Sequence, residues 1–211
     1  MGLQMSHSSD SDNGAIVYRY SASPNKIYLN ITNRCRNSCY FCLKNHCSGI
    51  SGYTLWLDKE PTIHDAWDSL KSEVKNSDKE VVFCGFGEPT VRLDTVLELT
   101  KMIKEIYPHL HIRLNTDGLA QLQNKNRKVV KELKEAGIDS ISISLNAENE
   151  EMYNELCKPS VIGSYKAVLD FAKECRAIFS QIRLSAVNIS DIDVLKCKRI
   201  ADELDCEFLL R

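Results

Sequence analysis

Residues 26–42 read KIYLNITNRCRNSCYFC, and this stretch joins a strand pattern to three closely spaced cysteines. Polar and apolar side chains alternate through Lys26–Thr32, which predicts a β-strand with one apolar and one polar face. Cys35, Cys39 and Cys42 follow the strand at the spacing Cys-x3-Cys-x2-Cys. Thiolates this close together on one loop can converge on a single soft metal centre. The stretch therefore predicts a metal-binding loop at the end of a strand.

After this stretch the chain alternates predicted strands with predicted helices, a pattern typical of crossover connections and a parallel sheet. The predicted strands are Lys26–Thr32, Glu80–Cys84, His111–Asn115, Ser140–Asn146, Gln181–Val187 and Cys206–Leu210. Apolar residues at helical spacing predict helices at Thr62–Lys75, Leu93–Tyr107, Asn126–Ala136, Ser164–Phe179 and Asp191–Leu204. Ala15–Tyr20 is predicted as a short edge strand ahead of them.

The predicted strands alternate polar and apolar residues, whereas strands covered by helices on both faces are continuously apolar. The polar side chains that share a face are Asn30, Arg113, Asn115, Ser142, Ser144, Asn146, Arg183 and Ser185. We therefore predict an α/β fold, a partial (β/α)6 TIM-like barrel of parallel strands with helices outside and these residues around one cavity. The alternative is a flat two-layer sheet with one solvated face.

The chain has 211 residues, with 27 Lys plus Arg against 29 Asp plus Glu and a formal net charge of −2. This balance gives no electrostatic basis for nucleic-acid binding. The sequence has neither the roughly 18-residue apolar run of a membrane span nor a signal peptide, so we expect a cytoplasmic protein. We expect residues 1–14, rich in Ser, Asp, Asn and Gly, to be a disordered tail, and residues 15–211 to be a single domain.

The nine cysteines are an odd number, and disulfides are not expected in a reducing compartment. Three thiolates at residues 35–42 are one short of a closed zinc site or a fully ligated cluster. A [4Fe–4S] cluster on three cysteines keeps one iron open to an outside ligand. Two alternatives stay open, namely structural zinc with Cys47 as the fourth ligand, and an electron-transfer cluster ligated entirely by cysteines.

The cysteine spacing resembles the signature of the radical S-adenosylmethionine (SAM) superfamily, in which an aromatic residue such as Phe41 precedes the last cysteine. Residues 85–89, GFGEP, resemble the Gly-Gly-Glu motif that ends the second strand in that superfamily, with Phe86 inserted between the glycines. Residues 115–118, NTDG, extend the resemblance, which covers Lys26–Arg211. Residues 30–32, 45–57 and 154–159 look like the small TatD-family-associated radical SAM proteins, a narrower group.

The resemblance implies a [4Fe–4S] cluster on Cys35, Cys39 and Cys42, with the open iron bound by the amino and carboxylate groups of SAM. Reductive cleavage of SAM then releases a 5′-deoxyadenosyl radical, which abstracts hydrogen from the substrate. The resemblance also implies an electron donor such as flavodoxin or ferredoxin as a partner.

The resemblance also implies a set of cofactor-binding residues. In the SAM-binding turn, Gly85 and Gly87 would allow close backbone approach and positive φ, and Glu88 would hold the SAM ammonium. Ser144 and Asn146 match the position of ribose contacts. Arg183 would pair with the SAM carboxylate or an acidic substrate, or else belong to a structural ion pair. The other candidates for cofactor binding are Phe41, Phe86 and Asn115.

The sequence leaves the substrate open between several classes. A radical SAM enzyme acting on a small polar metabolite is the first hypothesis, because the core is compact and the predicted cavity is polar. The alternatives are modification of a peptide or protein in the manner of activating enzymes, modification of tRNA or a nucleotide, and a zinc or iron–sulfur binding module without enzymatic activity. A second subunit in a homodimer is one way to close the open side of the barrel.

Overall fold

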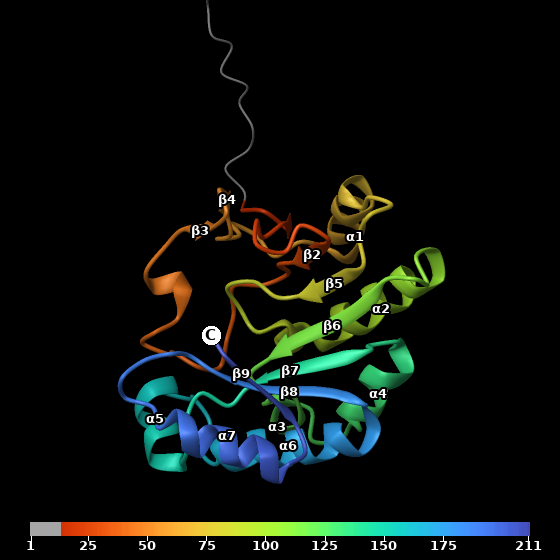
Figure 1. Cartoon of the computed structure of the whole chain (residues 1–211). Coiled ribbons are helices and arrows are strands. Elements are labelled where there is room, and N and C mark those ends of the chain that lie inside the picture. The colour runs from red at the N-terminus through yellow and green to blue at the C-terminus, as the bar shows by residue number, and fades with distance from the viewer. Residues whose placement is uncertain (1–13) are drawn as a thin grey trace, which may run out of the picture.

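A computed structural model describes residues 14–211, and a seven-stranded sheet runs through it in the order β1-β2-β5-β6-β7-β8-β9 (Figure 1). Its strands are β1 (Val17–Tyr18), β2 (Lys26–Leu29), β5 (Glu80–Phe83), β6 (His111–Thr116), β7 (Ser140–Ser144), β8 (Gln181–Ala186) and β9 (Glu207–Leu210). Only the β1–β2 pair in this sheet is antiparallel. The six predicted parallel strands and the short edge strand are confirmed, with their ends shifted by at most three residues.

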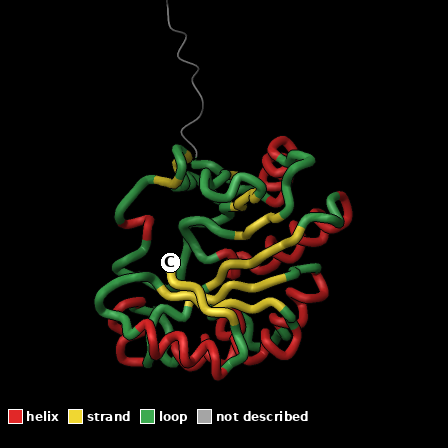
Figure 2. The backbone as a smooth tube through the Cα atoms, viewed as in Figure 1, coloured by secondary structure: helices red, strands yellow, loops and turns green. Residues whose placement is uncertain are grey.

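The helices lie between the strands, as the alternating pattern predicts (Figure 2). They are α1 (Ile63–Glu73), α2 (Leu93–Ile106), α3 (Ala120–Gln123), α4 (Val129–Ala136), α5 (Glu150–Cys157), α6 (Ser164–Ile178) and α7 (Val194–Glu203), with 3-10 turns η1 (Leu43–Asn45) and η2 (Pro89–Arg92). The five predicted helices are confirmed, whereas α3 and α5 are additional. The α5 helix had a usable signal, because Asn149 caps it by accepting a hydrogen bond from Met152 N at 2.9 Å.

The apolar faces of the strands form the core against the helices. Ile27, Leu114 and Ile143 are fully buried in one cluster with apolar residues of the surrounding helices. The sheet curves with its helices on the outside, and its edge strands β1 and β9 are not paired with each other (Figure 1). The predicted α/β partial barrel is therefore confirmed, and a flat two-layer sheet is not found.

The polar faces do not surround one cavity, which corrects the prediction. The Arg113 guanidinium pairs with the Glu80 carboxylate at 2.9 Å, and Arg183 pairs with Glu207 at 2.9 Å. Both arginines line a cavity of about 100 Å³ whose walls include the first residues of six strands. Alternation predicts which face of the sheet a side chain lies on, but not which end of the sheet it lies near. It therefore did not distinguish Arg113 and Arg183, near the amino ends of the strands, from the polar residues near the carboxyl ends.

A small hairpin covers the polar face near β2. Asn30, which was predicted to line the cavity, lies beneath this cover. The hairpin pairs β3 (Gly49–Ile50) with β4 (Tyr53–Thr54), and Leu55 behind it packs with Tyr18 and Phe86 in a second apolar cluster. Asn30 Nδ2 donates to the backbone oxygen atoms of Ala15 and Leu55 at 3.0 and 2.7 Å. Asn30 therefore ties this cover to the sheet.

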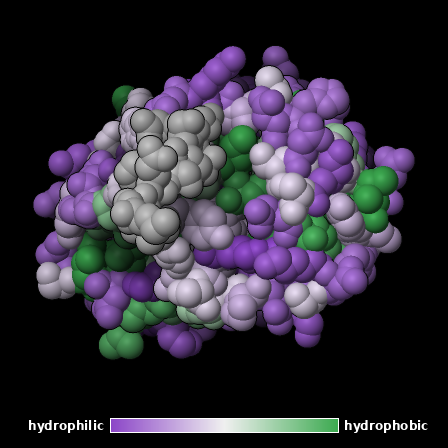
Figure 3. Space-filling view, turned by 90° about the horizontal axis from the view of Figure 1, so that it is seen from above, coloured by the Kyte–Doolittle hydropathy of each residue, from purple (hydrophilic) through white to green (hydrophobic). Residues whose placement is uncertain are grey.

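The face of the protein that is seen from above is mainly hydrophilic, with small separate hydrophobic patches (Figure 3). Within residues 14–211, no helix is long and apolar enough to cross a membrane. The predicted tail lies outside the described residues except for Gly14, which is buried against the backbone of Trp56.

We expect Ile143→Asp to lower the free energy of unfolding by about 4 kcal/mol or more, because it places a charge at a fully buried position. Urea unfolding followed by circular dichroism measures this change. The matched control is Ile162→Asp, because Ile162 is 99% exposed and its replacement should change stability by less than about 0.5 kcal/mol. Equal stability of the two variants would contradict the assignment of Ile143 to the buried face of β7.

Candidate active site

The cysteine loop, residues 33–47, leaves the carboxyl end of β2 and reaches across to α5 before returning to the hairpin (Figure 1). Backbone hydrogen bonds hold it there. Ser38 N donates to Cys157 O at 2.9 Å, and Ser160 N donates to Arg36 O at 2.9 Å. Asn37 Nδ2 donates to the hydroxyl of the buried Tyr153 at 3.0 Å. The loop therefore connects the first parallel strand to the helix that follows β7.

The GFGEP turn packs directly on the start of the cysteine loop. A Cβ atom on Gly87 would overlap the carbonyl oxygens of Thr32 and Arg34, and one on Gly85 would overlap the Asn30 side chain. Glu88 N donates to Arg34 O at 2.8 Å. Close packing against residues 30–34 of the chain thus accounts for both glycines. The predicted positive φ is wrong, because neither Gly85 nor Gly87 is among the glycines with positive φ.

Glu88 is a buried structural carboxylate, so the prediction that it holds a ligand ammonium needs revision. Its Oε1 accepts from Thr90 N at 2.9 Å and from the hydroxyls of Thr90 and Thr116 at 2.7 and 2.8 Å. Its Oε2 accepts from Asp117 N at 2.6 Å. Burial raises the pKa of Glu88, and these four hydrogen bonds oppose that shift. Glu88 therefore joins the ends of β5 and β6 and fixes the turn.

Asp117 lies beside Glu88 and was missed as a site residue. Burial, together with the neighbouring Glu88 charge, raises the pKa of Asp117 well above its usual value. Its Oδ1 accepts from Leu119 N at 2.9 Å, and its Oδ2 lies 4.0 Å from Cys35 Sγ. The NTDG motif that contains it provided the sequence signal.

The three predicted metal ligands are half-buried free thiols. Cys35 Sγ accepts from Asn37 N at 3.4 Å, and burial with the nearby Asp117 raises the Cys35 pKa. The Cys39 thiol lies beside the buried Cys157 thiol, and this contact and burial raise the Cys39 pKa. Cys47 is exposed, and its thiol donates to Leu43 O at 3.4 Å. Cys157 is therefore an additional cysteine in contact with the loop, and no sequence spacing indicated it.

Three predicted polar residues carry side-chain oxygens that are buried without a hydrogen-bond partner. They are Asn30 Oδ1, which lies against Gly85, and Asn115 Oδ1 and Asn146 Oδ1, near the carboxyl ends of β6 and β7. Asn146 also adopts a left-handed backbone with φ of 58°, which asparagine tolerates better than most residues. An unpaired buried acceptor costs about 1–3 kcal/mol, so these oxygens are suited to donors of a bound molecule.

Ser144 lies at the end of β7, where Arg211, a residue missed by the sequence reasoning, donates to its hydroxyl at 3.1 Å. Arg211, which follows β9, therefore links the end of that strand to the end of β7.

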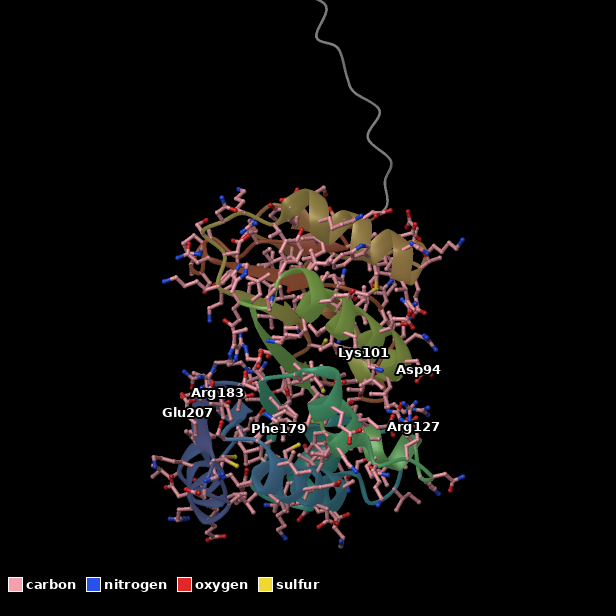
Figure 4. All side chains as sticks on the ribbon, turned by 90° about the vertical axis from the view of Figure 1, so that its right-hand side faces the viewer. Asp94, Lys101, Arg127, Phe179, Arg183 and Glu207 are labelled. Atoms are coloured by element: carbon pink, nitrogen blue, oxygen red, sulfur yellow. The ribbon has the colours of Figure 1, made fainter. Side chains whose placement is uncertain are left out.

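The remaining predicted residues lie elsewhere. Phe86 packs into the second apolar cluster, and Phe41 packs on the main core with its ring 5.5 Å from the Tyr40 ring. Arg183 pairs with Glu207 at the strand starts, at the opposite edge of the molecule from Asp94 and Arg127 (Figure 4). Phe86 is thus held by apolar packing, and Arg183 forms an ion pair, which is the structural alternative predicted for it.

The donor set fits an iron–sulfur cluster. Within residues 14–211, no group of three His, Cys, Asp or Glu side chains is placed to hold a single metal ion. A cubane cluster takes each thiolate on a different iron, so its ligands stand further apart than those of one ion. The chain offers three half-buried thiols on one anchored loop beside the GFGEP turn, one for each of three irons.

Comparisons with known proteins agree with this geometry. The Radical SAM superfamily matches residues 29–190. GTP 3',8-cyclase of Corynebacterium glutamicum (strain R) is 27% identical over 193 residues, which are 87% of this chain and 47% of that protein. The 7,8-dihydro-6-hydroxymethylpterin dimethyltransferase of Methanocaldococcus jannaschii is 33% identical over 131 residues, which are 59% of this chain and 23% of that protein. The chain thus spans about half or less of the length of these curated relatives.

Solved structures show the same fold at low identity. TYW1 with a lysine-pyruvate adduct superposes with a TM-score of 0.62 and 14% identity over 89% of this chain and 64% of that chain. Methylornithine synthase (PylB) gives a TM-score of 0.61 and 14% identity over 88% of this chain and 52% of that chain. The cyclase relatives support the superfamily and not specifically the narrower resemblance to TatD-family-associated proteins. The family match over residues 29–190 shows that the chain belongs to the radical SAM superfamily.

Proposed function

We propose that this chain is the catalytic core of a radical SAM enzyme acting on a small polar metabolite. Members of the superfamily use a [4Fe–4S] cluster and SAM. The observation that carries the proposal is the contact between the GFGEP turn and a loop with three half-buried thiols, next to unpaired buried oxygens. When bound, the cluster and SAM would supply a 5′-deoxyadenosyl radical that abstracts hydrogen from the substrate.

In this proposal, each part of the chain has a defined task. Cys35, Cys39 and Cys42 hold the cluster as thiolates, because metal coordination removes the thiol protons. The backbone of the GFGEP turn binds the SAM ammonium, whereas the Glu88 carboxylate fixes the turn through its four hydrogen bonds. Asn146 accepts a hydrogen bond from a ribose hydroxyl, which would satisfy its unpaired oxygen.

For the substrate, we favour a nitrogen heterocycle such as a purine nucleotide or a pterin. This choice rests on the relatives, whose names specify GTP and a hydroxymethylpterin. The unpaired Asn115 oxygen would accept a hydrogen bond from a ring or amino N–H group of such a molecule. A nucleotide substrate belongs to the predicted alternative of tRNA or nucleotide modification, which the cyclase relatives favour over modification of a peptide.

The test is anaerobic reconstitution with iron and sulfide, followed by reduction with dithionite in the presence of SAM. We expect 5′-deoxyadenosine to form, and its rate to rise when the correct heterocycle is added. Liquid chromatography with mass spectrometry measures the product. A reconstituted chain that binds zinc instead of iron, and leaves SAM intact, would rule out the enzyme.

Replacing Cys35, Cys39 or Cys42 by Ala should remove the cluster, because each thiolate ligates a separate iron. Cys47→Ala is the matched control and should keep the cluster, since Cys47 is exposed. Iron content and electron paramagnetic resonance report the result. Loss of the cluster in Cys47→Ala would instead indicate ligation by four cysteines.

Gly87→Val should weaken SAM binding without removing the cluster, because the new side chain overlaps the Thr32 and Arg34 carbonyls and displaces the turn. We expect a cost in stability of about 1–3 kcal/mol. Gly52→Val is the control, since its Cβ meets no atom within 4 Å, although its φ of 87° makes the substitution strained. Anaerobic calorimetry measures SAM affinity, and equal affinities in the two variants would remove the turn from the site.

A further inference from the structure

A small charged cavity, which we call the amino-end cavity, lies where the six parallel strands of the sheet begin. Its volume is about 100 Å³, and its walls include the first residue of each of those strands, among them Lys26, Glu80 and Glu207. Arg113 and Arg183 are the third residues of β6 and β8, so they lie one layer further into the sheet on the same face. The cysteine loop and the GFGEP turn follow the carboxyl ends of their strands, so the amino-end cavity is separate from the candidate active site.

The lining of the amino-end cavity carries more positive than negative charge. Its cations are Lys26, Arg113 and Arg183, and its carboxylates are Glu80 and Glu207, so three minus two leaves an excess of one positive charge. This excess is local, because the whole chain has a formal net charge of −2. Glu80 is shared between two cations, since its Oε2 lies 2.5 Å from Lys26 Nζ and its Oε1 lies 2.9 Å from Arg113 Nε. One carboxylate therefore compensates two positive charges.

Both arginines have a buried N–H donor that no acceptor satisfies. Arg183 donates through Nη2 to the two Glu207 oxygens at 3.0 and 2.9 Å, and Figure 4 shows these side chains next to each other. Its Nε is buried and has no hydrogen-bond partner within residues 14–211. Arg113 Nε is also buried, and it is not aligned for a hydrogen bond to the nearby Glu80 oxygen. Because unsatisfied buried donors are costly, both groups are suited to an acceptor on a bound molecule.

The strand between the two arginines leaves space for such a molecule. β7 lies between β6 and β8, and its residues in register with the arginines are small, Ser140 opposite Arg113 and Ser142 opposite Arg183. Neighbouring strands lie about 4.8 Å apart, so the two strands that carry the arginines are roughly 10 Å apart. Two like charges that face one cavity repel each other, and an anion between them would replace this repulsion by attraction.

We propose that the amino-end cavity binds a small oxyanion, either phosphate or a carboxylate group, between Arg113 and Arg183. Guanidinium groups present a planar fork of N–H donors that matches two oxygens of such a group. The volume of about 100 Å³ corresponds to roughly three water molecules at about 30 Å³ each, which suits one phosphate and is too small for a nucleotide. The bound anion would connect β6 to β8 and stabilise the amino end of the sheet. This proposal does not depend on the proposed function, because it uses no residue of the cysteine loop or the GFGEP turn.

A metal cation fits the amino-end cavity less well. Both carboxylates already pair with basic side chains, Glu80 with Lys26 and Arg113, and Glu207 with Arg183. In the described part of the chain, no three His, Cys, Asp or Glu side chains are grouped so that they could hold a metal ion. Water alone would leave the positive excess uncompensated. A cation site and a cavity that holds only water are therefore the competing outcomes of the test.

The test follows thermal unfolding of the full chain by circular dichroism while sodium phosphate replaces sodium chloride at constant ionic strength in Tris buffer. We expect a saturable rise in Tm of about 2–4 °C, because a ligand that binds only the folded chain stabilises it. Calorimetric titration gives the Kd for phosphate and, in a second arm, for acetate. Tighter binding of acetate than of phosphate would assign the site to a carboxylate group, and the reverse order would assign it to phosphate.

Arg113→Gln and Arg183→Gln should each weaken phosphate binding by about tenfold or more, because each removes a charged donor. Both variants should fold, since Glu80 keeps Lys26 as a partner and the Glu207 side chain is 62% exposed. Arg199→Gln is the matched control, because it makes the same change at an exposed position of α7 and should alter the Kd by less than about twofold.

Three results would overturn the anion site. The first is a Tm that neither phosphate nor acetate raises above its value in chloride, which would leave a cavity that holds only water. The second is a rise in Tm that is as large in Arg113→Gln and Arg183→Gln as in the wild type, which would place the anion elsewhere. The third is stabilisation by magnesium chloride without stabilisation by phosphate, which would indicate a cation site. The chain is measured without cluster or SAM, so none of these results bears on the proposed function.

Discussion

The structure depends on the contact between the GFGEP turn and the beginning of the cysteine loop. Gly87 leaves no room for a side chain against the carbonyls of Thr32 and Arg34, and Glu88 N bonds to Arg34 O. The contact sets how closely the two segments that follow β2 and β5 approach each other. The Glu88 carboxylate extends the same link to the end of β6. These contacts connect the carboxyl ends of β2, β5 and β6.

The sequence could predict the fold because local pattern and packing agree. Alternation in His111–Thr116 and Ser140–Ser144 gives buried isoleucines and leucines on one face, and the sheet places that face on the helices. Glycines at positions 85 and 87 correctly signalled a close approach. Gly85 approaches the Asn30 side chain and Gly87 approaches the backbone of Thr32 and Arg34, which no local pattern could have revealed.

The candidate site was less predictable, since its geometry depends on contacts between distant segments. Period-two alternation correctly placed Arg113 and Arg183 on the polar face. Each arginine, however, forms an ion pair with a carboxylate near the amino ends of the strands, Glu80 for Arg113 and Glu207 for Arg183. Phe86 was assigned to the cofactor with its glycine neighbours, but it turns away because apolar surface is available at Tyr18 and Leu55. Cys157 lies more than one hundred residues beyond the loop that it contacts.

The anchoring of the cysteine loop on α5 has a consequence for the order of folding. Residues 36–38 bond to the backbone of residues 157–160, so the loop gains its final shape only after the segment that follows β7 has folded. Contacts of such long sequence separation form late, because closing the long loop costs entropy before the contact compensates it. A nascent chain would therefore complete most of its sheet before its thiols are ordered. Cofactor assembly thus acts on a nearly finished domain and adds stability at the last step of maturation.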